Sequence, residues 1–186
     1  MKPKSSKPEE EKRFEEEVNE EKIVKLVMFS LDQEIYGIEI EQVVEINRTL
    51  EITPVPNSPE YIEGLIDLRG EVIAIIDPEK RFGLKRETPI SKKHTIVCQS
   101  AEAKFGLLVD QVFKIINLPL NAVNKAPDLL KTKIKEKFVK GVGILNDRVF
   151  VILDASKIVT SEEIEGVKIS EGVNKNEDSN QKRSNN

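Results

Sequence analysis

The sequence has very few of the residues on which most protein chemistry depends: its 186 residues include no tryptophan, one histidine and one cysteine. The lone Cys98 excludes an internal disulfide, and one cysteine with one histidine is too few for a structural zinc site. No glycine-rich loop leads into Lys-Ser or Lys-Thr, the pattern of a phosphate-binding loop. No apolar run approaches the ~20 residues that span a bilayer, and no N-terminal segment resembles a signal peptide. We therefore expect a soluble, cytoplasmic protein without a cofactor or a metal.

The sequence also offers no convincing catalytic centre. Catalysis needs an activated nucleophile or a matched acid and base. His94 follows two lysines at the start of an expected strand, which is typical of an exposed loop or strand-edge histidine. Cys98 lies in the middle of the same strand, where a buried small hydrophobic residue is the simpler interpretation. The sequence thus predicts a protein that is not an enzyme.

The charge balance is acidic, with 33 Asp and Glu residues, 29 Lys and Arg residues and a formal net charge of −4. This balance argues against a protein that binds duplex nucleic acid or a membrane surface through phosphate attraction. The pairs Tyr36-Gly37 and Phe105-Gly106 could stack on the bases of a single strand. The acidic balance favours core or turn residues instead, so a single-stranded nucleic-acid-binding barrel remains an alternative of a different functional class.

Both ends of the chain differ from its middle. Residues 1–21 are rich in Glu, Lys, Pro and Ser, and the last residues, from about Ser170, are almost all polar. Such segments cannot bury enough apolar surface to offset the entropy of ordering them. We predict disordered tails over residues 1–21 and 167–186, which leaves a folded core over residues 22–166.

The core contains an internal duplication. The run from Tyr36 to Ile46 returns from Phe105 to Ile115, at a constant offset of 69 residues (105 − 36). A second run, 64–77, returns as 141–154 at an offset of 77 residues (141 − 64). Two related blocks in the same order indicate a repeated unit. We predict one barrel subdomain over residues 22–88 and a second over residues 89–166.

Each copy has the pattern of a small β-barrel. Short apolar runs such as 24–31, 72–76 and 149–153 are bounded by turns, as strands are. Asp77-Pro78-Glu79 is a helix-start signal near the end of the first copy. About five strands and one short helix per copy predict a small closed barrel. Because a domain of ~60 residues is marginal alone, we expect the two barrels to share a hydrophobic seam, with a groove where they meet.

Two charged residues stand in apolar surroundings in the first copy only. Glu45 lies in a Val-Val-Glu-Ile run and Arg69 in a Leu-Arg-Gly turn, whereas the second copy has Lys114 and Asn146 at the equivalent positions. The barrel therefore does not require them. They predict either a role of the first copy in binding, or an internal Glu45–Arg69 salt bridge, and the two interpretations are compatible. Asp67 could compete for Arg69.

In these motifs the sequence resembles the CheW family of chemotaxis coupling proteins. The family pattern runs through an aromatic-Gly-Ile turn, a Val-x-Glu-Ile strand, a Thr-Pro-x-Pro segment, an Asn-Leu-Arg-Gly signature, a buried strand and a short helix. The matching segments here are 36–38, 43–46, 53–56, 64–70 and 77–83, continued by 106–112, 126–127 and 141–143. The resemblance covers essentially the whole folded core. One departure is Asp67, where the family usually has asparagine.

The resemblance implies a mainly β fold of two tandem five-stranded SH3-like barrels that couples transmembrane chemoreceptors to the histidine kinase CheA. The receptor's cytoplasmic tip, a helical hairpin, would lie in the groove between the barrels. By motif position, the receptor groove would be lined by Ile40, Val43, Glu45, Gly64, Arg69, Val72, Val112 and Ile115. The CheA regulatory domain would contact barrel ends, near Arg48, Glu51, Lys93 and His94. Such a protein would be recruited to receptor arrays at the inner face of the membrane without inserting into it.

Three related alternatives have different standing. A detached regulatory region of CheA is disfavoured because no ATP-binding or dimerisation segment precedes the core. A CheV-like protein is disfavoured because the C-terminal tail is too short for a receiver domain. An adaptor of another receptor–kinase pathway, such as surface motility, stays open.

Overall fold

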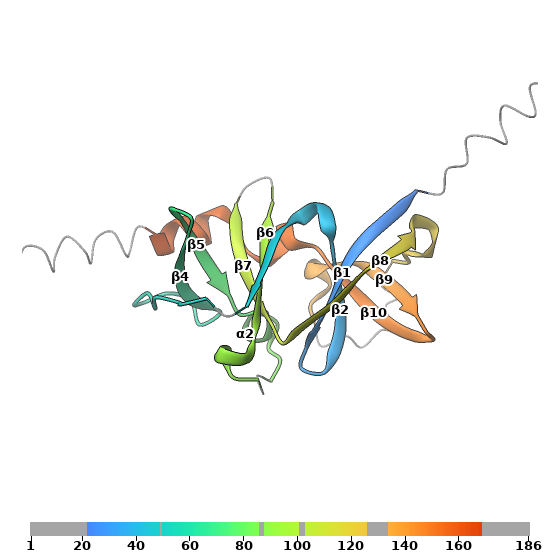
Figure 1. The fold of residues 1–186 in the computed structure, drawn as a ribbon, viewed down its shortest axis with the longest axis horizontal. Coiled ribbons are helices and arrows are strands. Elements are labelled where there is room, and N and C mark those ends of the chain that lie inside the picture. The colour runs from blue at the N-terminus through green and yellow to red at the C-terminus, as the bar shows by residue number, and fades with distance from the viewer. Residues whose placement is uncertain (1–21, 49, 86–87, 101–102, 126–133, 169–186) are drawn as a thin grey trace, which may run out of the picture.

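The computed structural model describes residues 22–48, 50–85, 88–100, 103–125 and 134–168, which form ten strands and several short helices (Figure 1). The first copy supplies β1 (Ile23–Leu31), β2 (Glu34–Glu39), β3 (Val43–Arg48), β4 (Ile62–Leu68) and β5 (Glu71–Ile76). The second supplies β6 (His94–Gln99), β7 (Lys104–Val109), β8 (Gln111–Pro119), β9 (Val139–Leu145) and β10 (Arg148–Leu153). The helical elements are η1 (Ile40–Gln42), α2 (Pro78–Phe82), η2 (Ile90–Lys92), η3 (Leu120–Ala122), η4 (Glu136–Phe138) and α3 (Ala155–Ile158).

The strands form two five-stranded sheets, and each sheet takes strands from both copies. Sheet A has the order β8-β1-β2-β10-β9 and sheet B the order β3-β6-β7-β5-β4. The pairing obeys the duplication: Tyr36 of β2 lies opposite Val151 of β10, and the equivalent Phe105 of β7 lies opposite Ala74 of β5. Both of these contacts are parallel, whereas the other strand pairs are antiparallel. The mainly β fold, the duplication and the five strands per sheet are confirmed.

The division into consecutive subdomains 22–88 and 89–166 does not match the sheets. The first two strands of each copy join the last three strands of the other, so the boundary at residue 88 separates the copies and not the sheets. The physical reason is that an offset identifies equivalent residues but says nothing about which strands form hydrogen bonds. The exchange links the two sheets twice, through β2–η1–β3 and through β7–β8.

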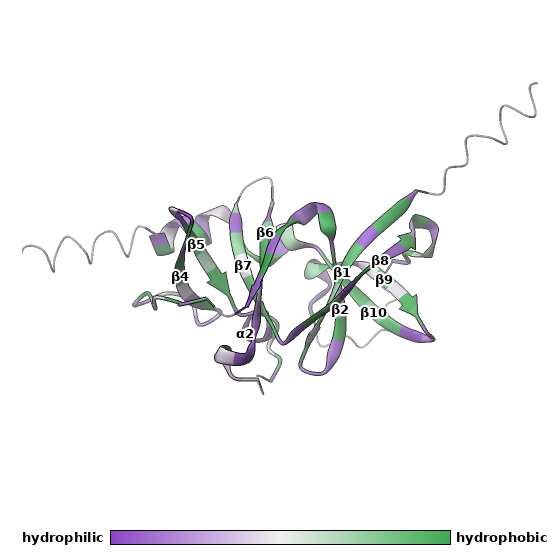
Figure 2. Ribbon diagram, in the orientation of Figure 1, coloured by the Kyte–Doolittle hydropathy of each residue, from purple (hydrophilic) through white to green (hydrophobic). Residues whose placement is uncertain are grey.

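The apolar residues form three clusters, which follow the alternation of side chains along each strand. One face of sheet A contributes Phe29 and Leu31 to a large cluster that also contains Ile76 and Leu107 of sheet B. The opposite face of each sheet has a smaller cluster of its own. Figure 2 shows the apolar strands and the polar turns that join them. The large cluster is the predicted hydrophobic seam between the two sheets.

A helix over residues 161–168 packs against this seam through Ile164 and Val167, both nearly fully buried. Its first turn is capped reciprocally, because Thr160 N–H donates to Glu163 and Glu163 N–H donates to the Thr160 hydroxyl. The predicted tail boundary at residue 167 is therefore wrong: Val167 belongs to the core. The remaining residues of both predicted tails lie outside the described residues. None of the described helices is long and apolar enough to span a bilayer.

Candidate functional site

Two equivalent edge strands, β3 and β8, each carry a bulge at the same place. Val43 pairs with Cys98 and Glu45 with Val97, which leaves Val44 as the extra residue of β3. In the equivalent stretch of β8, Val112 and Lys114 pair with β1 and Phe113 is the extra residue. Val44 and Phe113 are consequently both about half exposed. A β-bulge at an edge turns side chains outward, a feature common at binding sites.

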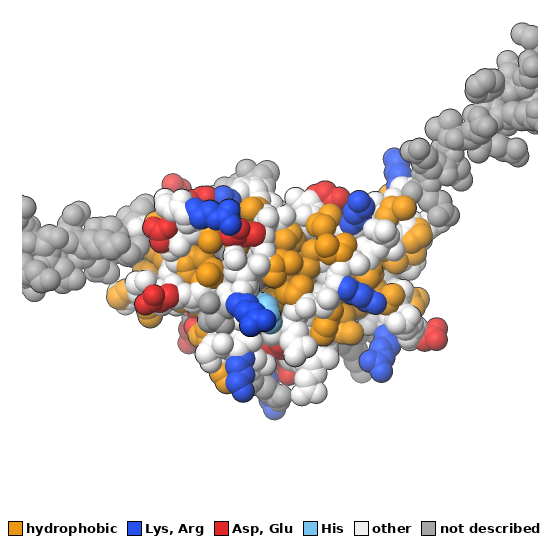
Figure 3. All heavy atoms as spheres, viewed as in Figure 1, with side chains coloured by type: hydrophobic (Ala, Val, Ile, Leu, Met, Phe, Trp, Pro, Cys, Tyr) orange, Lys and Arg blue, Asp and Glu red, His pale blue; other side chains and the backbone are white. Residues whose placement is uncertain are grey.

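On either side of the bulge, apolar residues of β3 and β8 face the seam. Val43 and Val112 are half-buried and pack against the large cluster. Further along, Ile46 is 42% exposed and Ile115 is 55% exposed. Figures 1 and 3 show both strands on the same side of the molecule, with apolar side chains gathered in the middle of that side and basic residues around them. We call the surface made by Ile40, Val43, Ile46, Val112 and Ile115 the β3–β8 face.

The other predicted groove residues lie elsewhere. Glu45 pairs with Val97, on the opposite side of sheet B from the seam, and so points away from the β3–β8 face. Its carboxylate accepts from Arg69 Nη2 at 2.9 Å, which joins β3 to the β4–β5 turn. This is the predicted Glu45–Arg69 pair. The sequence predicts apolar surroundings for Arg69, and this prediction is wrong: 81% of its side chain is exposed to solvent. Asp67 does not compete, since it accepts from the Gly70 N–H at 2.7 Å and closes the turn.

Gly64 and Val72 also lie away from the β3–β8 face. Gly64 is buried, and a Cβ at this position would lie 2.2 Å from the Thr53 carbonyl oxygen. Its role is close packing of the backbone. Val72 is exposed at the start of β5, opposite Asp67. We call Glu45, Arg69, Glu71, Val72 and Lys104 the paired edge of sheet B, because Lys104 also pairs with Glu71 there.

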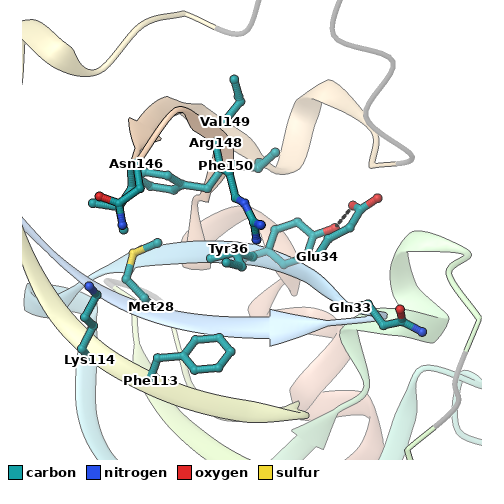
Figure 4. Close-up of a pocket in the computed structure, with 13 residues that line it drawn as sticks. Met28, Gln33, Glu34, Tyr36, Phe113, Lys114, Asn146, Arg148, Val149 and Phe150 are labelled. Carbon is teal, nitrogen blue, oxygen red and sulfur yellow. Dashed lines mark hydrogen bonds between the residues drawn. The ribbon is translucent and has the colours of Figure 1, made fainter.

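The region of sheet A that is equivalent to the paired edge is an apolar pocket. It has a volume of about 860 Å³ and lies between β8, the β1–β2 turn and the β9–β10 turn. Its lining residues are Met28, Gln33, Glu34, Ile35, Tyr36, Phe113, Lys114, Leu145, Asn146, Arg148, Val149, Phe150 and Val151. Figure 4 shows Phe113 and Lys114 on one side, and Asn146, Arg148 and Phe150 on the other.

Polar side chains contribute to the pocket lining beside the apolar ones. The Tyr36 hydroxyl donates to Glu34 at 2.8 Å, and burial together with this carboxylate raises the pKa of Tyr36 well above its usual value. Lys114 and Arg148 take the places that Glu45 and Glu71 hold in the paired edge. The pocket therefore combines an apolar floor with a basic rim.

Of the predicted kinase-facing residues, Arg48 and His94 lie opposite each other on β3 and β6, whereas Lys93 is buried. Arg48 and Glu51 are exposed, and His94 is half-buried with Nδ1 3.3 Å from the Asp110 carbonyl oxygen. Lys93 was expected on an exposed loop, but only 1% of it is exposed. Its Nζ lies 2.5 Å from Glu79 Oε2 and 2.8 Å from Asp110 Oδ1. We call Lys93, Glu79 and Asp110 the ionic clasp, a cluster that sequence reasoning missed.

The buried Cys98 behaves as predicted, since it belongs to the seam and burial raises the pKa of its thiol. Among the residues that the structure describes, no group of three or more His, Cys, Asp and Glu side chains is placed to hold a metal ion. The features that distinguish this molecule are thus surfaces: the β3–β8 face, the paired edge and the apolar pocket.

Comparison with known proteins gives a consistent result. A family model described as the CheW-like domain matches residues 25–163. A chemotaxis protein CheW of Treponema pallidum is 32% identical over 152 residues, covering 80% of this chain and 88% of the relative. A chemotaxis protein CheW of Klebsiella aerogenes is 30% identical over 138 residues, covering 74% and 82%. The crystal structure of a scaffolding protein, TtCheW of Thermoanaerobacter tengcongensis, superposes with a TM-score of 0.69 at 33% identity, covering 77% of this chain and 94% of that one.

Proposed function

Because the chain belongs to the CheW-like domain family, we propose that it is a non-enzymatic adaptor of chemotaxis signalling that couples chemoreceptors to the histidine kinase CheA. Relatives named chemotaxis protein CheW and a neighbour described as a scaffolding protein support this function. The observation that carries it is the β3–β8 face, where equivalent strands of both copies expose isoleucines beside the seam. The adaptor would act at receptor arrays on the inner face of the membrane.

The β3–β8 face fits the receptor's helical hairpin. A helix bound in this way buries apolar residues at a spacing of three or four, and needs a partner with apolar side chains on both flanks. Ile46 and Ile115 supply one such residue on each flank, and Val43 and Val112 form the floor. Of the predicted groove residues, Ile40, Val43, Val112 and Ile115 remain receptor contacts in this proposal, whereas Glu45, Gly64, Arg69 and Val72 do not.

Carboxylates placed on this face test the receptor proposal. Ile46→Asp and Ile115→Asp should each weaken binding of a soluble receptor hairpin by roughly 10- to 100-fold, because a carboxylate would have to be desolvated in the interface. Ile23→Asp is the matched control, since Ile23 is also about half exposed but lies at the far end of β1. Equal loss in the control, or retained binding in both test variants, would argue against the β3–β8 face as the receptor site.

The CheA regulatory domain is proposed to dock at the apolar pocket. The family's kinase contacts are expected at barrel ends, and this end of sheet A exposes Ile35, Phe113 and Val149 around the pocket. Exposed apolar residues around a cavity with a polar rim are typical of an interface core. Arg48, Glu51 and His94 lie outside the pocket lining, so we do not retain them as kinase contacts.

The duplication provides a matched pair of variants for the kinase. Val149→Asp changes the pocket, and Val72→Asp makes the same change at the equivalent position of the paired edge. We expect Val149→Asp to abolish capture of the CheA regulatory domain and Val72→Asp to retain it, with receptor binding intact in both. The reverse pattern would place the kinase site on sheet B instead.

A mobility shift with single-stranded DNA at physiological salt should be negative, and a positive shift would favour the nucleic-acid alternative.

A further inference from the structure

The ionic clasp lies where the chain crosses from sheet B to sheet A. Lys93 directly precedes β6 and Glu79 belongs to α2, and the side chains of both are fully buried. Asp110, whose side chain is 13% exposed, is the single residue between β7 and β8. The backbone N–H of Asp32, in the β1–β2 turn, donates to Glu79 at 3.3 Å and to Asp110 at 3.1 Å. The clasp therefore joins four segments that belong to both sheets.

The clasp acts directly on the start of β8. Asp110 N–H donates to the Ser30 carbonyl at 3.0 Å, so this residue is tied to β1 by its backbone and to Lys93 by its side chain. The next residues, from Gln111 to Phe113, form the bulged start of β8. The point at which the chain leaves sheet B and enters β8 is thus set by contacts that converge on Asp110.

The equivalent crossover, from β2 through η1 into β3, is built differently. Its residues that correspond to Lys93, Glu79 and Asp110 are Val24, Ser156 and Glu41. Valine and serine cannot replace a lysine and a carboxylate in an ion cluster. The contacts at this crossover are more exposed: Gln42 Nε2 donates to the Asp154 carboxylate at 3.4 Å, and Lys140 Nζ pairs at 2.6 Å with Glu39, the last residue of β2, with 45% of the lysine side chain exposed. The β7–β8 and β2–η1–β3 crossovers therefore differ in the contacts that hold the crossing strand in place.

Physical chemistry makes the clasp dependent on its cation. A buried carboxylate is tolerated when it is paired and hydrogen-bonded, and removing one partner leaves an uncompensated charge. Burial raises the pKa of Glu79, although its contact with Lys93 acts in the opposite direction. Loss of Lys93 would leave Glu79 and Asp110 close together without its ammonium group, with the Asp32 N–H as a donor that they share.

We propose that the ionic clasp is a positioning device that fixes the start of β8 against sheet B. The described residues around the start of β3 form more exposed pairs and no equivalent buried cluster, so β3 is the strand that adjusts. This asymmetry concerns the fold itself and does not depend on which partners bind. Lys93 is its central positioning residue. As a consequence, the β8 edge of the β3–β8 face is rigid and the β3 edge is flexible.

Hydrogen exchange on the full chain tests the proposal. In the unmodified protein, amides of residues 110–113 should exchange more slowly than those of the equivalent residues 41–44. Lys93→Met should accelerate exchange at residues 110–113 and at Asp32 by about 100-fold or more, while the central strands β6 and β7 stay protected. Lys92→Met is the matched control, because Lys92 is the exposed neighbour and the chemical change is identical.

Each result decides the matter. Acceleration that is equal throughout the molecule would mean that the clasp only adds global stability, and unchanged exchange at residues 110–113 would mean that the apolar seam alone holds β8. Either result overturns the proposal. If Lys93→Met does not fold, Asp110→Asn retains the Lys93–Glu79 pair and should produce a smaller acceleration at the same amides.

Spin labels provide a second measurement of the same device. Arg48→Cys and Asn117→Cys place labels at equivalent, exposed positions of β3 and β8. The natural Cys98 is buried and should not react. Adding Lys93→Met should broaden the distance distribution between the labels, whereas adding Lys92→Met should not. A distribution that stays unchanged with Lys93→Met contradicts a positioning role.

Discussion

The paired edge of sheet B and the apolar pocket of sheet A are the same structural place built twice. In sheet B, Glu45 and Arg69 bridge β3 and the β4–β5 turn, and Lys104 pairs with Glu71. In sheet A, the residues equivalent to Glu45 and Arg69 are Lys114 and Asn146, which cannot form an ion pair, and a cavity of about 860 Å³ remains between them. The duplicated backbone therefore accommodates either arrangement, and the barrel fold does not require the ion pair.

A similar contrast separates the backbone positions of the two copies. Gly64 and its counterpart Gly141 both lie against a segment that bridges to the next residue, through Thr53–Leu65 and Asn124–Val142. Gly64 has a φ of +147°, and the approach at Gly64 is the closer one. The two copies have thus kept the contact and changed how tight it is.

The largest expected effect on stability comes from adding a side chain at these two glycines. A Cβ at Gly64 would lie 2.2 Å from the Thr53 carbonyl oxygen, whereas at Gly141 it would lie 2.9 Å from that of Asn124. We expect Gly64→Ala to lower the free energy of unfolding by roughly 2–4 kcal/mol, and Gly141→Ala by about 1–2 kcal/mol. Urea unfolding of both variants checks this, and equal losses would show that the two contacts are equally tight.

A second prediction concerns the helix at the end of the described chain, whose Glu163 binds side chains of the first copy. Glu163 accepts from the Tyr61 hydroxyl at 2.6 Å and from Arg81 at 3.0 Å, whereas the residues equivalent to Tyr61 and Arg81 are Phe138 and Ile158. Burial raises the pKa of Glu163, but the hydrogen bonds and Arg81 outweigh it and hold the pKa below its usual value.

The sign of the pH dependence follows from this depressed pKa. The unfolded chain takes up a proton at higher pH than the folded one, so the stability that Glu163 contributes is present near neutral pH and is lost as the pH falls through its folded pKa. Glu163→Gln should cost roughly 1–2 kcal/mol at pH 7 and progressively less in acid. Thermal unfolding between pH 7 and pH 3 measures this, and a cost that grows in acid would contradict the contact.

A third prediction converts the pocket into a paired edge. Lys114→Glu with Asn146→Arg transfers the Glu45–Arg69 pair to sheet A. Since the new side chains would bridge the cavity, we expect about tenfold weaker binding of the CheA regulatory domain, about 1.4 kcal/mol, with receptor binding unchanged. Titration calorimetry with each partner provides the measurement. Kinase binding that survives the double change would show that the pocket is not the docking site.

The smallest effect is expected from the pair itself. Arg69 is largely exposed, and exposed pairs contribute little, so a double-mutant cycle on Glu45→Gln and Arg69→Met should give a coupling of about 0.2–1 kcal/mol. The same cycle on Asp67 and Arg69 should be additive, because Asp67 accepts from the Gly70 N–H instead. Coupling only in the Asp67 cycle would reject the observed pairing.

The elements of the fold can be predicted from the sequence, but only part of the surface contacts can. The duplication, the strands, the buried Cys98 and the helix that Asp77 caps are all predictable, because they depend on periodicity and local signals. Asp77 accepts from the backbone N–H groups of Glu79 and Lys80, as a helix-start signal implies. The Glu45–Arg69 pair was also predictable, from the contrast between the copies.

The exchange of strands and the burial of Lys93 could not be predicted. Local patterns do not say whether the strands of one copy form a sheet among themselves or pair with strands of the other copy. Lys93 stands beside the exposed Lys92, and its partners Glu79 and Asp110 lie 14 and 17 residues away in the sequence. Nothing near Lys93 distinguishes it as the buried one, because that outcome depends on long-range packing.

The exchanged strands also impose an order on synthesis. As the chain leaves the ribosome, β1 and β2 emerge first, yet sheet A is incomplete until β10 ends at Leu153. The apolar strands β1 and β2 therefore wait for most of the synthesis without a complete sheet to join, a state prone to wrong associations. A message truncated after the first copy would yield a product that cannot complete either sheet. Sheet B has all its strands once β7 ends at Val109, so the strand exchange makes translation to near the end a condition for completing sheet A.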